Sequence, residues 1–386
     1  MNAETKKQNG QFFTKNSDYI LSGFSQYIKN KSAVDPFAGN QDLISWAKKK
    51  GVKKIIGFDV DKNYVDDRIV FWRDSINSPQ KYKFVITNPP YLHKNKADKN
   101  TKEKYFKGYN SQFEDLYQLS IKSVLDSEEG ILIVPLNFLS AENSRRTRDL
   151  FFDRFKILRL NIFSEQVFED TTYNVVSFYF KRKKDNFSEN KISAIIFPEM
   201  KKVELVLEKQ YNWQFGGEFI NRVKKTRNYL GIFRLTEDYL GSGEHKIEMA
   251  LQNIKDKKIF HIDYGLKKTI ENNILFLRAI DSKNGKKIQL EDIRDYKING
   301  LVGKKTSRNM AHLIFKSKIP IAEQKQLMID FNDKLNEERE RYSSYFLTNF
   351  RDNNRKRMSF DLAYKFLNYI YANKNNFNKR QKLLFS

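Results

Sequence analysis

Hydrophobic positions follow two alternating rhythms in the first half of the chain. Short runs of β-branched and aromatic residues, typical of buried strands, are separated by stretches in which apolar residues recur at helical spacing. The expected strands are Ala33–Asp35, Lys54–Phe58, Ile69–Trp72, Phe84–Thr87, Ile131–Val134, Ile157–Ile162 and Val175–Phe180. The expected helices include Asp18–Ile28, Gln41–Lys50 and Gln112–Leu125. This order predicts βαβ units around a mostly parallel sheet, with an antiparallel edge formed by the last two strands.

The rhythm changes after about residue 184. The polar segment 181–190 predicts the exit from the sheet, and residues 200–320 contain only a weak mixture of short elements. Helices are expected from Ile321 to about Leu347 and over Phe360–Tyr371, the second with Ser359 as its N-cap. For 386 residues this predicts two domains, 1–185 and 200–386, of which the second is smaller and mixed α/β.

Charge is distributed unevenly between the two halves. The chain has 71 Lys and Arg against 47 Asp and Glu, a net charge of +24, with 33 against 25 in residues 1–200 and 38 against 22 in residues 201–386. This excess in the second half predicts a C-terminal domain that binds a polyanion. An AT-rich genome, which raises lysine content in general, is the alternative explanation.

The composition excludes several kinds of site. Without Cys the chain has no disulfide framework, iron–sulfur cluster or thiolate zinc site, and its 4 His give little material for a histidine cage, so no metal is expected. No apolar run reaches 18 residues, and the N-terminus lacks the apolar core of a signal peptide. We therefore expect a cytoplasmic protein with no membrane partner.

The segment Asn88-Pro89-Pro90-Tyr91 directly follows the apolar strand Phe84–Thr87. Two prolines end the strand and hold an extended turn at its carboxyl end, where open α/β sheets bind ligands. The Asn88 amide oxygen and the Pro89 carbonyl can each accept an N–H of an exocyclic base amine, which frees the nitrogen lone pair for attack on an electrophilic carbon. The Tyr91 ring can stack on the same base. A stiff loop without chemistry is the alternative.

Three other strand ends carry residues suited to a nucleoside. Gly39, in the segment Asp35–Leu43, lets the backbone approach a ligand closely, and the helix that follows favours a carboxylate or phosphate at its N-terminus. Asp59 ends the next strand 20 residues later, the spacing at which a carboxylate binds both ribose hydroxyls, with Asp61 as its rival. Asp74 ends the third strand and can accept from an adenine amino group.

In this order, the segments resemble the γ-type N6-adenine DNA methyltransferases of restriction–modification systems, over residues 11 to about 182. The resemblance implies a Rossmann-like, seven-stranded class I methyltransferase sheet that uses S-adenosylmethionine and no metal. It implies cofactor contacts from Gln11, Phe13, Thr14, Asp35, Phe37, Ala38, Gly39, Asp59, Val60, Asp74, Ser75, Asn88 and Leu116. It also implies a catalytic group of Asn88, Pro89, Pro90, Tyr91 and Phe168, the last stacking on the flipped base opposite Tyr91.

Two positions depart from the family pattern. The cofactor loop usually continues with a second glycine, where this chain has Asn40-Gln41. The helix that begins near residue 115 lacks the aromatic residue that usually contacts the cofactor's adenine, a place left open to Leu116 or Tyr117. Tyr173 is the alternative to Phe168 for stacking on the target base.

The second half contains no comparable motif. Its loop Gly303–Asn309 has side chains suited to base edges, with Arg308 for guanine and Asn309 for adenine, and the basic linker Arg351–Arg357 suits phosphates. The expected DNA contacts are Lys304, Lys305, Arg308, Asn309, Arg355, Lys356 and Arg357. Solvated loops without a ligand are the alternative for both segments.

These features predict site-specific methylation of adenine N6 in duplex DNA, in a restriction–modification system whose endonuclease acts separately. Methylation of RNA adenine or of a glutamine amide suits the same tetrapeptide, although the charge asymmetry counts against glutamine. A non-catalytic DNA-binding protein with this fold is a third alternative. The recognition sequence, the oligomeric state and the host stay open.

Overall fold

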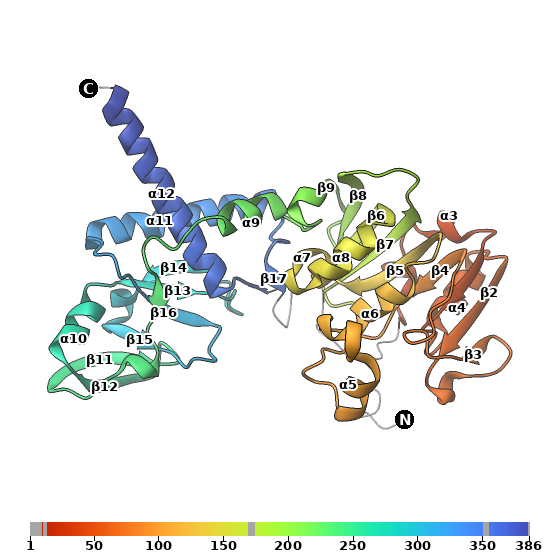
Figure 1. The fold of residues 1–386 in the computed structure, drawn as a ribbon, viewed down its shortest axis with the longest axis horizontal. Coiled ribbons are helices and arrows are strands. Elements are labelled where there is room, and N and C mark those ends of the chain that lie inside the picture. Colours follow the sequence, from red (N-terminus) through yellow and green to blue (C-terminus); the bar gives the residue numbers. More distant parts are fainter. Residues whose placement is uncertain (1–9, 11–13, 169–173, 350–354, 385–386) are drawn as a thin grey trace. The chain divides into compact units, whose positions relative to one another are not determined.

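The computed structural model describes residues 10, 14–168, 174–349 and 355–384, which form two compact units (Figure 1). The first unit runs to Gly217, and the second begins at Glu218. The expected domain limits lie earlier, at residues 185 and 200. The difference arises because the intervening residues extend the sheet of the first unit.

A nine-stranded mixed sheet forms the centre of the first unit, in the order β3-β2-β1-β4-β5-β7-β6-β8-β9. Its strands are β1 Ser32–Asp35, β2 Lys54–Asp59, β3 Val70–Trp72, β4 Phe84–Thr87, β5 Glu129–Pro135, β6 Phe155–Phe163, β7 Val175–Arg182, β8 Glu189–Phe197 and β9 Lys201–Glu208. Strands β1 to β5 pair in parallel, whereas β7 runs antiparallel between β5 and β6. All seven predicted strands are confirmed, as is the α/β class of the fold.

Two further strands change the expected topology. β8 pairs in parallel with β6, and β9 pairs antiparallel with β8, so the antiparallel pair β6–β7 lies inside the sheet and not at its edge. The predicted exit over 181–190 is wrong, because this segment contains the end of β7 and the start of β8. Buried and exposed residues alternate along most of β8, since only one of its faces is covered. Its polar outer face hid the strand in the sequence.

The helices of this unit are α2 Ser17–Ile20, α3 Ser25–Ile28, α4 Asp42–Lys49, α5 Lys99–Tyr105, α6 Leu116–Ser123, α7 Asn137–Ser140 and α8 Arg145–Phe152. The helix expected over 18–28 is divided at Gly23, whose φ of +79° lies outside the helical region. The helix expected from Gln112 begins only at Leu116, because Asp115 and Gln118 form a capping box there.

The second unit is also mixed α/β. Its strands form a four-stranded sheet (β10-β16-β13-β14), a three-stranded sheet (β12-β11-β15) and the pair β17–β18. They are β10 Phe233–Arg234, β11 His245–Leu251, β12 Lys257–Ile262, β13 Leu275–Arg278, β14 Gln289–Asp292, β15 Gly300–Val302, β16 Met310–Ile314, β17 Thr348–Asn349 and β18 Lys356–Arg357. Its helices are α9 Gly217–Lys224, whose first residue is the last of the first unit, α10 Tyr264–Glu271, α11 Ile321–Arg341 and α12 Phe360–Leu384.

The two long C-terminal helices pack together over the larger of these sheets. α11 lies against α12 and against β13 and β14 (Figure 1), and Leu327, Phe331, Leu335 and Phe366 are buried between them. α11 ends before the predicted Leu347, whereas α12 continues beyond Tyr371. In the part of the chain that the structure describes, no helix has both the length and the apolar content needed to span a bilayer.

Candidate active site

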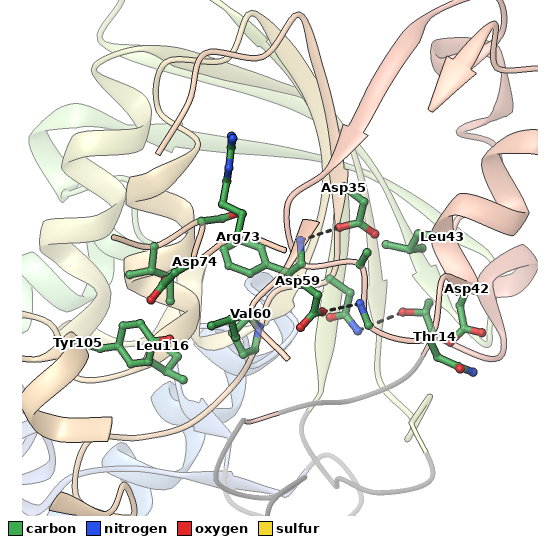
Figure 2. A pocket seen from close by; sticks show the side chains of 18 of the residues that line it. Thr14, Asp35, Asp42, Leu43, Asp59, Val60, Arg73, Asp74, Tyr105 and Leu116 are labelled. Carbon is green, nitrogen blue, oxygen red and sulfur yellow. Dashed lines mark hydrogen bonds between the residues drawn. The ribbon is translucent and has the colours of Figure 1, made fainter. Parts of the chain in front are cut away.

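The carboxyl ends of β1 to β4 border a cleft of about 860 Å³, part of it open to solvent (Figure 2). The predicted cofactor residues that the structure describes all line this cleft, namely Thr14, Asp35, Phe37, Ala38, Gly39, Asp59, Val60, Asp74, Ser75, Asn88 and Leu116. Gln11 and Phe13 lie outside the described residues. Parallel strands bring residues distant in the sequence together because their carboxyl ends share one edge of the sheet.

Asp59 ends β2 with both carboxylate oxygens bound by backbone donors. The Gly39 N–H donates to Oδ2 and the Asp61 N–H donates to Oδ1, each at 2.8 Å. Burial raises the pKa of Asp59, and these backbone hydrogen bonds oppose the shift. Each carboxylate oxygen has a second lone pair, so Asp59 can still accept two hydroxyls from the cleft. Its rival Asp61 accepts from both nitrogens of Asn63 in a local turn.

The loop after β1 turns at Gln41, where a second glycine is usual. Gly39 has a φ of +46°, and Gln41, the N-cap of α4, has a φ of +64° in the left-handed region. This conformation costs a residue with a Cβ about 1–2 kcal/mol. The Gln41 N–H donates to the Ala38 carbonyl at 2.9 Å, and its side chain donates to Asp66 Oδ2 at 3.0 Å. These bonds offset the cost, and the turn forms without the glycine.

Asp35 connects two of the strand ends beneath the cleft. Its carboxylate accepts the Thr87 hydroxyl at 2.6 Å and the Phe37 N–H at 3.1 Å. Burial raises the pKa of Asp35 to about 7. Because both bonds are internal to the protein, Asp35 holds the ends of β1 and β4 together.

One end of the cleft combines an acid with apolar side chains. Asp74, just after β3, accepts from the backbone and side-chain nitrogens of Asn77 and pairs with Lys104 Nζ at 3.0 Å. Leu116 and Tyr105 lie near Asp74 on the cleft wall (Figure 2). A planar ring bound here would meet both an acceptor and an apolar surface.

Tyr105 is the residue of this end that the sequence analysis missed. It is the last residue of α5 and supplies an aromatic side chain where the sequence offered Leu116 or Tyr117. Of these two, Leu116 lines the cleft, whereas Tyr117 is buried elsewhere with its hydroxyl 2.7 Å from Ser144 Oγ. Helix α5 forms within a polar, lysine-rich segment that lacks the apolar spacing by which the sequence analysis identified helices.

The Asn88 side chain is held at both ends. Its Nδ2 donates to Thr14 Oγ1 at 3.1 Å, and the Tyr91 hydroxyl lies 2.6 Å from its Oδ1. The same hydroxyl lies 2.9 Å from the Ile133 carbonyl. A phenol has one proton to donate, so Tyr91 can release Asn88 Oδ1 and keep a partner at Ile133. The acceptor oxygen of Asn88 is therefore oriented in advance and can become available to another donor.

The backbone of the tetrapeptide is fixed from two sides. The Tyr91 N–H donates to the Gly10 carbonyl at 2.9 Å, and a Cβ at Gly10 would lie only 2.8 Å from the Tyr91 carbonyl oxygen. On the other side, the Leu92 N–H donates at 3.0 Å to Asp115, the cap of α6. Asp115 thus connects the end of the tetrapeptide to the helix that borders the cleft.

Replacing Asp115 by Asn should remove a pH-dependent loss of stability. Burial raises the pKa of Asp115 from its ordinary value of 3.8 to about 7. Between these values the folded state keeps a proton that the unfolded state has lost, so this group's contribution to stability falls as pH rises from about 4 to about 7. The melting temperature of Asp115→Asn, relative to wild type, should therefore rise over this range and level off above it. Thermal melts of both proteins measure this, and a difference independent of pH would contradict it.

Phe168 lies beside Tyr91, and both rings are buried. The ring centroids are 6.5 Å apart, and the ring planes are inclined by 64°. The two ring faces are therefore not parallel, as a planar ring stacked between both of them would require. Tyr173, the alternative to Phe168, lies outside the described residues.

The predicted DNA contacts lie in the second unit and differ in exposure. Lys304, Lys305, Arg308 and Asn309 are exposed on the loop between β15 and β16. Lys356 contradicts the prediction, because it is only 2% exposed in β18, with its Nζ 5.3 Å from the centre of the Tyr345 ring. Burial lowers the pKa of Lys356 to about 7. Arg355 is half-buried and donates to the Asp281 carbonyl at 2.7 Å, so the basic linker is partly a structural element.

Metal ligands do not gather anywhere in the described part of the chain. Among those residues, no group of three or more His, Asp or Glu side chains is arranged to hold a metal ion. The acids of the cleft instead accept hydrogen bonds from backbone groups, hydroxyls and a lysine.

The first unit also matches a known family. Residues 5–168 match the family model described as Eco57I restriction-modification methylase. This segment, which is less than half of the chain, is similar to the restriction-modification methylases. The methylase segment contains the acid-lined cleft, the tetrapeptide and Phe168, and the resemblance predicted from the sequence is confirmed for it.

Several solved structures are similar to this chain at low identity. They include a modification subunit assigned to a type I restriction enzyme from Vibrio vulnificus YJ016 (14% identity, 52% of this chain and 50% of that chain, TM-score 0.38). Another is the type IIG restriction endonuclease BpuSI, at 12% identity over 65% of this chain and 42% of that chain, with a TM-score of 0.43. A third is a type I methyltransferase subunit from Streptococcus thermophilus, at 12% identity over 50% of this chain and 47% of that chain, with a TM-score of 0.32. This chain spans about half of their length, and at these TM-scores they add no argument to the family match. No curated protein matches the sequence.

Proposed function

We propose that the chain transfers a methyl group from S-adenosylmethionine to N6 of an adenine flipped out of a short duplex DNA sequence. The observation that carries this proposal is the position of Asn88–Tyr91 at the edge of the acid-lined cleft. Asn88 and Pro90 line the cleft, and the Tyr91 ring lies beside Phe168. A methyl donor in the cleft and a base amine at the tetrapeptide would then be neighbours.

The charge of the cleft fits S-adenosylmethionine better than a nucleotide phosphate. Asp35, Asp42, Asp59 and Asp74 line it, and Arg73 is the one basic residue in its described lining. Such a surface attracts the sulfonium and ammonium groups of S-adenosylmethionine and repels the phosphates of a dinucleotide. Among the described lining residues, acids outnumber basic residues, which favours a cationic ligand over the phosphates of a dinucleotide.

The described residues can hold each part of that cofactor. Asp59 would accept the ribose hydroxyls, since each of its oxygens keeps a lone pair. Asp74 would accept from the adenine amino group, after Lys104 gives way, with Tyr105 and Leu116 against the ring. Thr14, beside Asn88, would contact the methionine part.

The tetrapeptide would supply the chemistry at the acceptor. The cofactor provides a methyl group on a positively charged sulfur. Asn88 Oδ1 and the Pro89 carbonyl would each accept one N–H of the adenine amine, and the Tyr91 hydroxyl would keep its bond to Ile133 instead. The amine becomes cationic on methylation and only then loses a proton, so no strong base is needed. Positioning and electrostatics provide the acceleration.

The basic second unit favours DNA over the alternatives. Residues 201–386 have 38 Lys and Arg against 22 Asp and Glu, which a small glutamine substrate does not require. RNA would suit the same charge, so the substrate must be tested directly. A separate restriction endonuclease that cuts the same unmethylated sequence is the partner activity we propose.

The test uses the purified protein, S-adenosylmethionine, unmethylated genomic DNA and total RNA in parallel. We expect nucleoside mass spectrometry to detect N6-methyladenine in the DNA alone, and single-molecule sequencing to locate it at one short motif. Methylation of RNA alone would support the proposed methyl transfer to adenine but show that the substrate is RNA and not DNA. Cofactor binding without methylation of either nucleic acid would contradict the proposed function.

A further inference from the structure

Two arginines of the second unit lie close together without an acidic partner. Arg308 is exposed on the loop between β15 and β16, and Arg357 is half-buried in β18. Neither guanidinium has an ion pair or a side-chain hydrogen bond with another described residue. Burial and the positive charge of Arg308 together lower the pKa of Arg357. A partly desolvated cation beside a second cation is unfavourable unless an anion joins them.

The backbone holds these arginines on either side of one residue. The Ala279 N–H, just after β13, donates to the Asn309 carbonyl at 2.8 Å, and the Ala279 carbonyl accepts the Met358 N–H at 2.9 Å. Arg308 and Arg357 are the residues immediately before these two partners. Segments 49 residues apart in the sequence therefore bring their arginines close together as part of the fold.

Hydrogen bonds from Arg234 fix the loop that carries Arg308. Arg234, in β10, donates from Nη1 to the Ser307 carbonyl at 2.5 Å and from Nη2 to the Lys305 carbonyl. Its guanidinium lies 4.9 Å from the centre of the Phe360 ring. A braced loop loses little conformational entropy when it binds, so the arginine pair is organised in advance.

Two acids that contact the segments of these arginines are already engaged. Asp281 accepts two hydrogen bonds from Arg339, each at 2.8 Å, and Asp238 pairs with Lys305 at 2.9 Å. Neither carboxylate is left to neutralise the arginine pair. No described acid forms an ion pair with either arginine, so an anion from outside the described residues can balance their charge.

We infer that Arg308 and Arg357 together bind one phosphodiester group of the DNA backbone. The inference deepens the proposed function, since it takes duplex DNA as the partner. Two planar guanidinium groups can each donate to phosphate oxygens, and one phosphate would relieve the repulsion between them. A guanine edge, which Arg308 alone was expected to read, is neutral and would leave the second charge unbalanced. The pair thus fixes the position of the duplex and does not read its sequence.

The test compares Arg308→Gln, Arg357→Gln and the double variant in the full chain. Binding to a fluorescent duplex of random sequence is measured by anisotropy at several salt concentrations. Each single variant should bind about tenfold more weakly, and the plot of log K against log[salt] should be less steep by about one unit. Because one phosphate is shared, the double variant should be hardly weaker than either single variant. Lys255→Gln, which removes an exposed cation from the turn between β11 and β12 of the same unit, is the matched control and should change binding least.

Thermal melts separate this role from a structural one. Removing one of two adjacent unpaired charges should leave the melting temperature of the free protein unchanged or raise it. A lower melting temperature with unchanged DNA affinity would overturn the inference. So would additive losses that reduce the slope by about two units, or weakening confined to one base sequence. If wild type binds RNA but not DNA, the proposed occupant is wrong.

The two proposals can fail separately. If the arginine variants lose DNA affinity while wild type makes no methyladenine, the phosphate site stands without the methylation. If wild type methylates DNA and the arginine variants bind duplexes as wild type does, only the phosphate site is lost.

Discussion

Asn88→Ala is expected to lower the rate of methyl transfer by about 10²–10³-fold, with little change in cofactor affinity. Removing one preorganised group that stabilises a developing charge typically has an effect of this size. The Asn88 oxygen is preorganised here, since Thr14 Oγ1 holds the amide nitrogen at 3.1 Å and the Tyr91 hydroxyl lies 2.6 Å from the oxygen. An alanine would lose the acceptor and leave the rest of the cleft in place.

Single-turnover methylation of DNA measures the rate, and calorimetry with S-adenosylhomocysteine measures cofactor affinity. Asn186→Ala is a suitable control, because Asn186 is exposed in the turn between β7 and β8 of the same unit. The control should match wild type in both measurements. A rate for Asn88→Ala close to that of wild type would exclude Asn88 as the acceptor of the amine. An equal loss of rate and cofactor affinity would instead give Asn88 a role in binding the cofactor.

The strands and the composition of the cleft could be predicted from the sequence because each depends on a local pattern. Short β-branched and aromatic runs identify buried strands without reference to the rest of the chain. Parallel pairing then determines where Asp35, Asp59, Asp74 and Asn88 must meet, since each stands at the end of its strand. The loop after β1 could be assigned although its second glycine is missing, because Gln41 itself adopts the left-handed conformation.

The features that could not be predicted depend on contacts between distant segments. Tyr105 reaches the cleft from a short helix whose sequence is polar, and only the path of the chain after β4 brings it there. Lys356 stands among basic residues and suggests a surface, yet pairing of β18 with β17 buries its side chain. Strand β8 shows the reverse, because its exposed polar face concealed a strand of the main sheet.

Asp59→Ala should weaken binding of S-adenosylhomocysteine by about 10- to 150-fold for each ribose hydrogen bond that is lost. A hydrogen bond to a charged group contributes about 1.5–3 kcal/mol, and one or two such bonds to ribose hydroxyls would be lost. Part of the effect would come from the loop, because Gly39 N–H and Asp61 N–H lose their acceptor at the same time. Since burial raises the pKa of Asp59, binding to wild type should also weaken as pH falls toward that raised value, when the carboxylate takes up a proton.

Two matched variants separate these contributions. Asp59→Asn keeps one acceptor oxygen without the charge, so its affinity should lie between those of wild type and Asp59→Ala. Asp61→Ala removes a neighbouring carboxylate that accepts from Asn63, and calorimetry should find its cofactor affinity close to that of wild type. If Asp61→Ala instead shows the large loss and Asp59→Ala does not, the ribose contact belongs to Asp61. The cofactor would then bind further from the end of β2, and the distance from its methyl group to Asn88 would have to be reconsidered.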